Sequence, residues 1–93
     1  MTIQVFLVED DPEFGRQLVD LIRTNPLLQL CGWVDTVALA LDNIRTSHAD
    51  VFLVDLGLPD GSGQTVIQHI ARVQPTARVM VLSTLGDPKH ILS

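Results

Sequence analysis

The segment VFLVDLGLPDGSG, residues 51–63, contains the change of pattern that decides the fold. Val51 to Leu56 is the most apolar strand candidate in the chain, and its length suits a buried strand. A Pro-Asp-Gly turn and then a helical pattern follow it directly. The apolar positions of that helix are Val66, Ile67, Ile70 and Val73. We therefore predict a strand, a turn and a helix in succession.

The same succession is repeated along the rest of the chain. Further strand candidates occupy residues 3–8, 28–34 and 78–83. Helical faces are formed by Phe14, Leu18, Leu21 and Ile22, and by Val37, Ala40, Leu41 and Ile44. Asn25-Pro26 and Gln74-Pro75 end two helices, and Asp87-Pro88 begins a fourth. Parallel strands need crossover helices, so this alternation predicts an α/β fold with a doubly wound parallel sheet.

Length and composition predict one soluble globular domain. The 93 residues are 46% hydrophobic and 18% charged, and no apolar run approaches the roughly 20 residues that span a bilayer. A net charge of −5 disfavours binding of these residues to a phosphate backbone. Cys31 is the single cysteine, expected as a small buried side chain in a strand. We expect a cytoplasmic protein that binds neither membrane nor DNA directly.

Acidic residues follow two of the predicted strands. Glu9 and Asp10 come after the first strand and Asp55 lies at the end of the third. Ligands of doubly wound sheets bind beyond the carboxyl ends of the strands, so we expect these three carboxylates to converge there. Their mutual repulsion calls for a hard cation, and Mg²⁺ suits such a site when phosphate oxygens complete its coordination. Asp55 is then a possible nucleophile toward a phosphoryl group.

Each of these residues also has a structural interpretation. Asp11 before Pro12 is most simply a helix N-cap, as are Thr36 after Asp35 and Ser62 or Gly63 after the turn. Glu9 and Asp10 could be solvated loop charges, and Ser83 a strand-end hydroxyl bonded to backbone. The three histidines, His48, His69 and His90, have no ligand-like spacing, and Trp33 is expected to pack in the core or at an edge strand.

Taken together, the motifs VFLVEDDP, DVFLVDLGLPDGSG and RVMVLST resemble the receiver domain of bacterial two-component response regulators. The resemblance extends over essentially the whole chain. It implies a flavodoxin-like fold with strand order 2-1-3-4, in which the fifth strand and last helix are missing. We accordingly expect residues 1–93 to be a receiver domain that is truncated within its fourth helix.

The resemblance also implies a role for individual residues. Asp55 would be the phosphoacceptor, Asp10 would bind Mg²⁺ directly and Glu9 would hold a metal-bound water. Gly57 would offer its carbonyl oxygen to the metal, and Ser83 would be the switch hydroxyl. A sensor histidine kinase would be the phosphoryl donor. The amino-acid sequences of the motifs are most similar to those of regulators with a LuxR-like helix-turn-helix DNA-binding effector.

The chain departs from the family pattern toward its C-terminus. The family needs a lysine after the fifth strand, and Lys89, the only lysine here, lies at the predicted start of the fourth helix. We therefore expect slow phosphorylation and an uncoupled switch. An uncovered edge at the fourth strand also predicts a homodimer or an oligomer formed by element exchange.

Other function classes account for fewer of these features. Mg²⁺-dependent aspartyl phosphatases and phosphotransferases usually carry an acid two residues after the nucleophile, whereas Gly57 stands there. A nucleotide site is disfavoured because the turn after the first strand is acidic and lacks a Gly-rich loop. A short degenerate receiver that acts by protein contact alone stays open.

Overall fold

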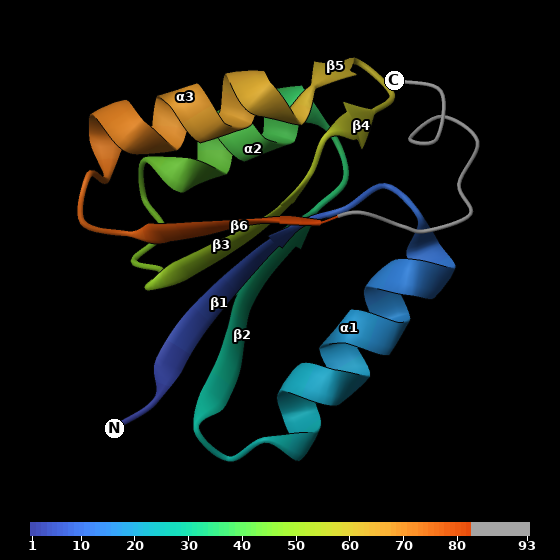
Figure 1. Ribbon diagram of the computed structural model, residues 1–93, viewed down its shortest axis with the longest axis vertical. Helices are drawn as coiled ribbons and strands as arrows, with labels where there is room; N and C mark the ends of the chain where they lie inside the picture. Colours follow the sequence, from blue (N-terminus) through green and yellow to red (C-terminus); the bar gives the residue numbers. More distant parts are fainter. Residues whose placement is uncertain (83–93) are drawn as a thin grey trace.

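The computed structural model describes residues 1–82, and they form a parallel sheet with helices on both faces (Figure 1). The elements in chain order are β1 (Ile3–Val8), α1 (Pro12–Thr24), β2 (Leu28–Val34), α2 (Val37–Ile44), β3 (Val51–Asp55), β4 (Gly57–Leu58), β5 (Gly61–Ser62), α3 (Gly63–Val73) and β6 (Arg78–Leu82). The main sheet has the order β2-β1-β3-β6 with all pairs parallel. This confirms the predicted doubly wound α/β fold and its strand order, with β6 as the fourth strand.

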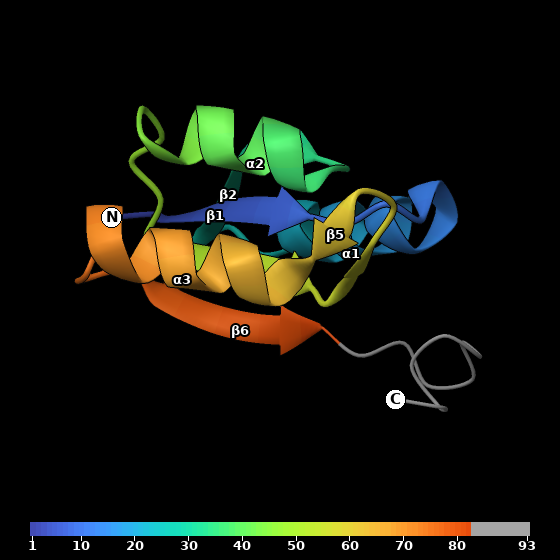
Figure 2. The same cartoon turned by 90° about the horizontal axis from the view of Figure 1, so that it is seen from above.

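The helices lie in two layers. Helices α2 and α3 lie together on one side of the sheet and α1 lies on the other (Figures 1 and 2). The core between the sheet and the α2–α3 layer includes Phe6, Val8, Phe52, Val54, Ile44 and Ile70. Alternate residues of β1 point the other way, and Val5 and Leu7 are buried there as well. Both faces of the central strand are therefore covered, as its unbroken apolar sequence predicts.

Side-chain caps begin all three described helices. Asp11 accepts hydrogen bonds from the amides of Glu13 and Phe14 at 3.0 and 3.2 Å. Thr36 and Ser62 cap α2 and α3 in the same way. The three caps predicted from sequence are confirmed, because an oxygen two or three residues before a helical amide is a local feature.

The predicted inner face of α1 is wrong by about one residue. Its buried residues are Gly15, Val19 and Ile22, whereas Leu21 is 66% exposed. The helix is rotated in this way because Gly15 lies against the ring of Trp33 on β2, and an added Cβ would overlap the ring unless the ring moved. On α3, Val73 is also 39% exposed, since it is the last residue of the helix.

Strand β2 contains a bulge that the sequence did not predict. Val5 pairs with Leu30, but the next residue of β1, Phe6, pairs with Gly32, so Cys31 is an extra residue. Cys31 is exposed, which corrects the expectation that it is buried. Gly32 is required beside it, because an added Cβ would lie 2.6 Å from Cε2 of Phe6.

The helix α2 is held at both ends by residues that flank α3. Asp60 accepts hydrogen bonds from the amides of Val37 and Ala38 at 2.7 and 3.0 Å. At the other end, the Gln74 side-chain amide donates to the carbonyls of Ile44 and Ser47. The loop that precedes α3 and the turn that follows it therefore fix where α2 lies.

Several predicted features lie outside the described residues. They are Ser83, the helix start at Asp87-Pro88, Lys89 and His90. Strand β3 ends at Asp55, one residue before the predicted end, because Leu56 begins the following loop. In residues 1–82, none of the helices has the length and apolar character needed to cross a bilayer.

Candidate functional site

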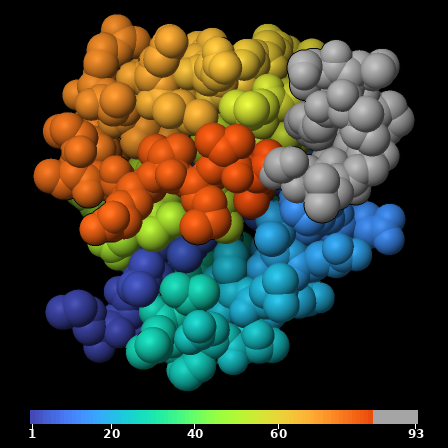
Figure 3. All heavy atoms as spheres, in the orientation of Figure 1, coloured from blue at the N-terminus to red at the C-terminus, as the bar shows by residue number. Residues whose placement is uncertain are grey.

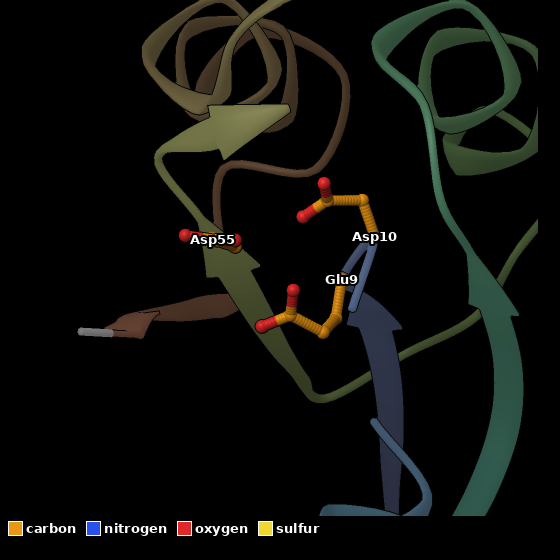
Figure 4. A group of neighbouring side chains, drawn as sticks. All are labelled: Glu9, Asp10 and Asp55. Atoms are coloured by element: carbon orange, nitrogen blue, oxygen red, sulfur yellow. The ribbon is translucent and has the colours of Figure 1, made fainter. Parts of the chain in front are cut away.

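Three carboxylates converge at the carboxyl ends of β1 and β3. These strands are neighbours, with Val8 paired to Val54, so the residues that follow them lie side by side. Figure 4 shows the side chains of Glu9 and Asp10 extending from the end of β1 toward Asp55. One carboxylate oxygen from each residue lies within 4.8 Å of those of the other two. The expected juxtaposition of these acids is therefore present.

Two of the three acids are almost completely buried. Glu9 and Asp55 are each 1% exposed. Oε2 of Glu9 accepts a hydrogen bond from the Asp11 amide at 3.0 Å, while Oε1 is buried and has no hydrogen-bond partner within residues 1–82. Burial, assisted by the adjacent carboxyl of Asp55 and opposed by the Asp11 amide, raises the pKa of Glu9 to about 8. Solvated loop charges would not show such burial.

The donor set fits a hard divalent cation. Buried carboxylates repel one another and lose hydration, and a cation between them removes both penalties. Oxygen ligands with no nitrogen or sulfur among them favour Mg²⁺ or a similar ion over zinc or copper. The unpartnered Oε1 of Glu9 is the atom that most needs such a partner.

The loop after β3 brings Gly57 next to the acids. Its amide donates to Oδ1 of Asp55 at 3.2 Å, and Gly57 also pairs with Ser62 in the short β4–β5 hairpin. Gly63 then starts α3 so close to the end of β3 that an added Cβ would overlap the Asp55 carbonyl oxygen. The packing around Asp55 thus explains the glycine at position 63.

Trp33 bonds to a residue of the site, and Asp60 lies in the hairpin that follows Asp55; sequence reasoning assigned neither of them a role there. The Trp33 indole Nε1 donates to the carbonyl oxygen of Glu9 at 2.9 Å. Asp60 ties the β4–β5 hairpin to the start of α2, and its hydrogen bonds from Ala38 and Val37 lower its pKa. Both contacts join residues more than 20 positions apart, so no local pattern marks them.

An open cavity of about 310 Å³ adjoins the acids. Its lining residues are Glu9, Asp10, Pro12, Trp33, Val34 and Asp35. The cavity lies between the end of β2 and the start of α1, beside Glu9 and Asp10, whereas Asp55 is not among its lining residues.

The described histidines lie outside the acidic cluster. His48 is exposed and follows α2, whereas His69 is half-buried on α3. Within residues 1–82, Glu9, Asp10 and Asp55 form the only group of three or more potential metal ligands. The site therefore depends on carboxylates, as expected from the spacing of the histidines.

Comparison with known families gives one match along nearly the entire chain. A family model described as the response regulator receiver domain matches residues 5–93. The chain is 33% identical over 90 residues to the DNA-binding transcriptional activator DevR/DosR of Mycobacterium tuberculosis, and the alignment covers 97% of this chain and 42% of that protein. It is 29% identical to a protein-glutamate methylesterase/protein-glutamine glutaminase 2 of Photobacterium profundum, with coverage of 89% and 21%.

The fold is also found among solved structures. The crystal structure of the response regulator domain of Thermotoga maritima CheB matches with a TM-score of 0.83 at 22% identity, over 99% of this chain and 68% of that one. The chain spans less than half the length of the two curated relatives. The similarity to them is therefore a similarity to one part of larger proteins.

Proposed function

Because the chain belongs to the response regulator receiver family, we propose that it accepts a phosphoryl group on Asp55 from the phosphohistidine of a sensor kinase. The observation that carries this proposal is the buried carboxylate cluster. Asp55 and Glu9 are both 1% exposed, and Oε1 of Glu9 has no partner in the described part of the chain. A protein gains no stability from such a cluster, so a ligand for it is the simplest reason for its presence.

The chemistry we propose requires one nucleophile. A carboxylate oxygen of Asp55 forms a bond to phosphorus, the phosphorus–nitrogen bond of the donor breaks, and the imidazole keeps the electron pair and takes up a proton. Mg²⁺, when bound, neutralises charge on the transferred group. Asp10 and Asp55 would hold the ion directly, Glu9 through a water and Gly57 through its carbonyl. Ser83, outside the described residues, would donate a hydrogen bond to a phosphoryl oxygen.

Phosphorylation by a small acyl-phosphate donor tests the assignment of Asp55. The unaltered chain is incubated with the donor and Mg²⁺, beside Asp55→Asn and the control Asp20→Asn, an exposed acid on α1. We expect phosphate that is released by alkali and by hydroxylamine, as from an acyl phosphate, on the unaltered chain and the control, and none on Asp55→Asn. Equal labelling of all three proteins would refute Asp55 as the acceptor.

The rate of this reaction tests the expected impairment. Residues 1–93 contain a single lysine, Lys89, and we do not assign it the family's role of pairing with the acyl phosphate. We therefore expect slow labelling and weak coupling to any conformational switch. Rates equal to those of a longer chain that includes the family lysine would contradict this.

We propose that the receiver controls a DNA-binding effector of the LuxR-like type and thereby transcription. The similarity to the activator DevR/DosR supports this, whereas the methylesterase relative shows that a segment similar to this chain also occurs in an enzyme. A reading frame that continues past Ser93 into a helix-turn-helix sequence would support it, and continuation into a hydrolase would refute it. We propose a cytoplasmic location for the protein, because its proposed phosphoryl donor is a sensor kinase and its one cysteine, Cys31, is a free thiol that suits a reducing compartment.

We also propose that the chain forms a homodimer or a domain-swapped oligomer. Strand β6 lies at the edge of the sheet formed by residues 1–82, and its atoms, orange to red in Figure 3, lie on the surface. The side chains of Met80 and Val81 on this strand are 59% and 48% exposed. An apolar edge strand is a template for pairing with another chain. Light scattering should give at least twice the monomer mass at high concentration, and a well-folded monomer would refute the proposal.

A further inference from the structure

Trp33 reaches the acidic site from the neighbouring strand. Its indole Nε1 donates to the carbonyl oxygen of Glu9 at 2.9 Å, and the amide of Glu9 donates to the carbonyl of Val34 at 3.0 Å. Both backbone polar groups of Glu9 are therefore bonded to the last two residues of β2. In this way, the β1–β2 pairing is extended by one residue, to the point where the acids begin.

The bulge in β2 is what turns Trp33 toward this position. In a regular strand, Leu30 and Trp33, three residues apart, would point to opposite faces of the sheet. The extra residue Cys31 shifts the register, so that Leu30 pairs with Val5 and Trp33 with Leu7, and both side chains share the α1 face. The bulge therefore places the indole between the sheet and α1.

Gly15 provides the space that the indole needs. A Cβ added to Gly15 would overlap Cζ2 of Trp33 and lie 2.7 and 2.8 Å from Cη2 and Cε2. Gly15 is buried at the end of the first turn of α1, where glycine is otherwise unfavourable for a helix. A glycine at this position is explained by the ring that lies against it.

We infer that Trp33 is a positioning residue for the cation site, which fixes the Glu9 backbone through its indole N–H while packed against Gly15. With the backbone held and Oε2 bonded to the Asp11 amide, the Glu9 carboxyl is kept beside those of Asp10 and Asp55, within 4.8 Å of them. Asp10 follows directly in the chain and is positioned by the same anchor. The inference rests on the proposed function, because it concerns the proposed Mg²⁺ site.

Titration calorimetry with Mg²⁺ on the full chain tests this inference. Trp33→Phe keeps an aromatic ring on Gly15 but removes the N–H donor. We expect the dissociation constant for Mg²⁺ to rise about two- to tenfold, the range that corresponds to one neutral hydrogen bond. Cys31→Ser, an exposed change in the same strand, is the matched control and should bind Mg²⁺ as the unaltered chain does.

A second variant separates positioning from stability. Gly15→Ala should favour the helix intrinsically but push the indole away from Glu9, so we expect weaker Mg²⁺ binding without a matching loss of thermal stability. In the Trp33→Phe background the same change should have a smaller effect on binding, because the smaller ring leaves room for the methyl group.

The outcomes distinguish this inference from the proposed function. Equal Mg²⁺ affinity of the unaltered chain, Trp33→Phe and Gly15→Ala would overturn the positioning role and leave the metal site intact. No Mg²⁺ binding by the unaltered chain would overturn the proposed metal site and this inference with it. Weaker binding by both variants, with Cys31→Ser unchanged, would support the inference.

Discussion

Replacing Glu9 with glutamine should stabilise the chain in the absence of divalent cations while it weakens Mg²⁺ binding. The Glu9 carboxyl is 1% exposed and its pKa is raised from 4.5 to about 8. A group whose pKa is raised by folding binds its proton more tightly in the folded state. The folded state is therefore favoured by this group below pH 4.5 and loses that contribution as the pH rises through about 8.

The size of the effect follows from the difference in pKa. At about 1.4 kcal/mol per pKa unit, the glutamate at position 9 lowers the stability of the folded state at pH 7 by at most about 3 kcal/mol relative to a neutral side chain. Water that reaches the carboxyl and local relaxation reduce this penalty, so we expect Glu9→Gln to raise the free energy of unfolding by roughly 1–3 kcal/mol at pH 7. The glutamine oxygen can still accept from the Asp11 amide, so that hydrogen bond does not have to be lost.

Urea denaturation in EDTA between pH 4 and 8.5 measures this prediction. The free energy difference between Glu9→Gln and the unaltered chain should be small at the acidic end and should grow with pH. Glu13→Gln is the matched control, because Glu13 is an exposed glutamate in the first turn of α1, where its charge is mildly stabilising. A Glu9→Gln protein that is less stable at pH 8, or a difference that does not vary with pH, would refute the reasoning.

Two further substitutions test the packing around the acids. Gly63→Ala should destabilise the chain by about 2 kcal/mol and abolish labelling of Asp55, because the new Cβ would overlap the backbone carbonyl oxygen of Asp55. Thermal denaturation measures the loss of stability, and Gln64→Ala is the control. Unchanged stability would contradict the close approach of α3 to β3. Asp60→Ala should lower the melting temperature, since the amides of Val37 and Ala38 lose their acceptor. Because its hydrogen bonds lower the pKa of Asp60, its stabilising effect should be lost as the pH falls below 3.8, and a deficit that persists unchanged in acid would count against the contact.

The fold and the identity of the acids could be predicted from sequence because the responsible signals are local. Apolar runs of strand length, the cap formed by Asp11 and the turn after Asp55 each depend on residues a few positions apart. Parallel strands with crossover helices then bring the strand ends together, so the convergence of Glu9 and Asp55 follows from topology. The expected positions of Leu21 and Cys31 were wrong, because a rotation of α1 and a bulge in β2 leave little trace in periodicity.

Sequence by itself determined which groups are present and which strand ends carry them. Only the tertiary structure decided that Glu9 is buried with a raised pKa, that Trp33 holds its backbone, and that Asp60 caps a helix 22 residues earlier in the chain. The physical reason is that each of these properties belongs to a pair of segments distant in sequence. Burial, register and long-range hydrogen bonds exist only once the sheet has brought those segments together.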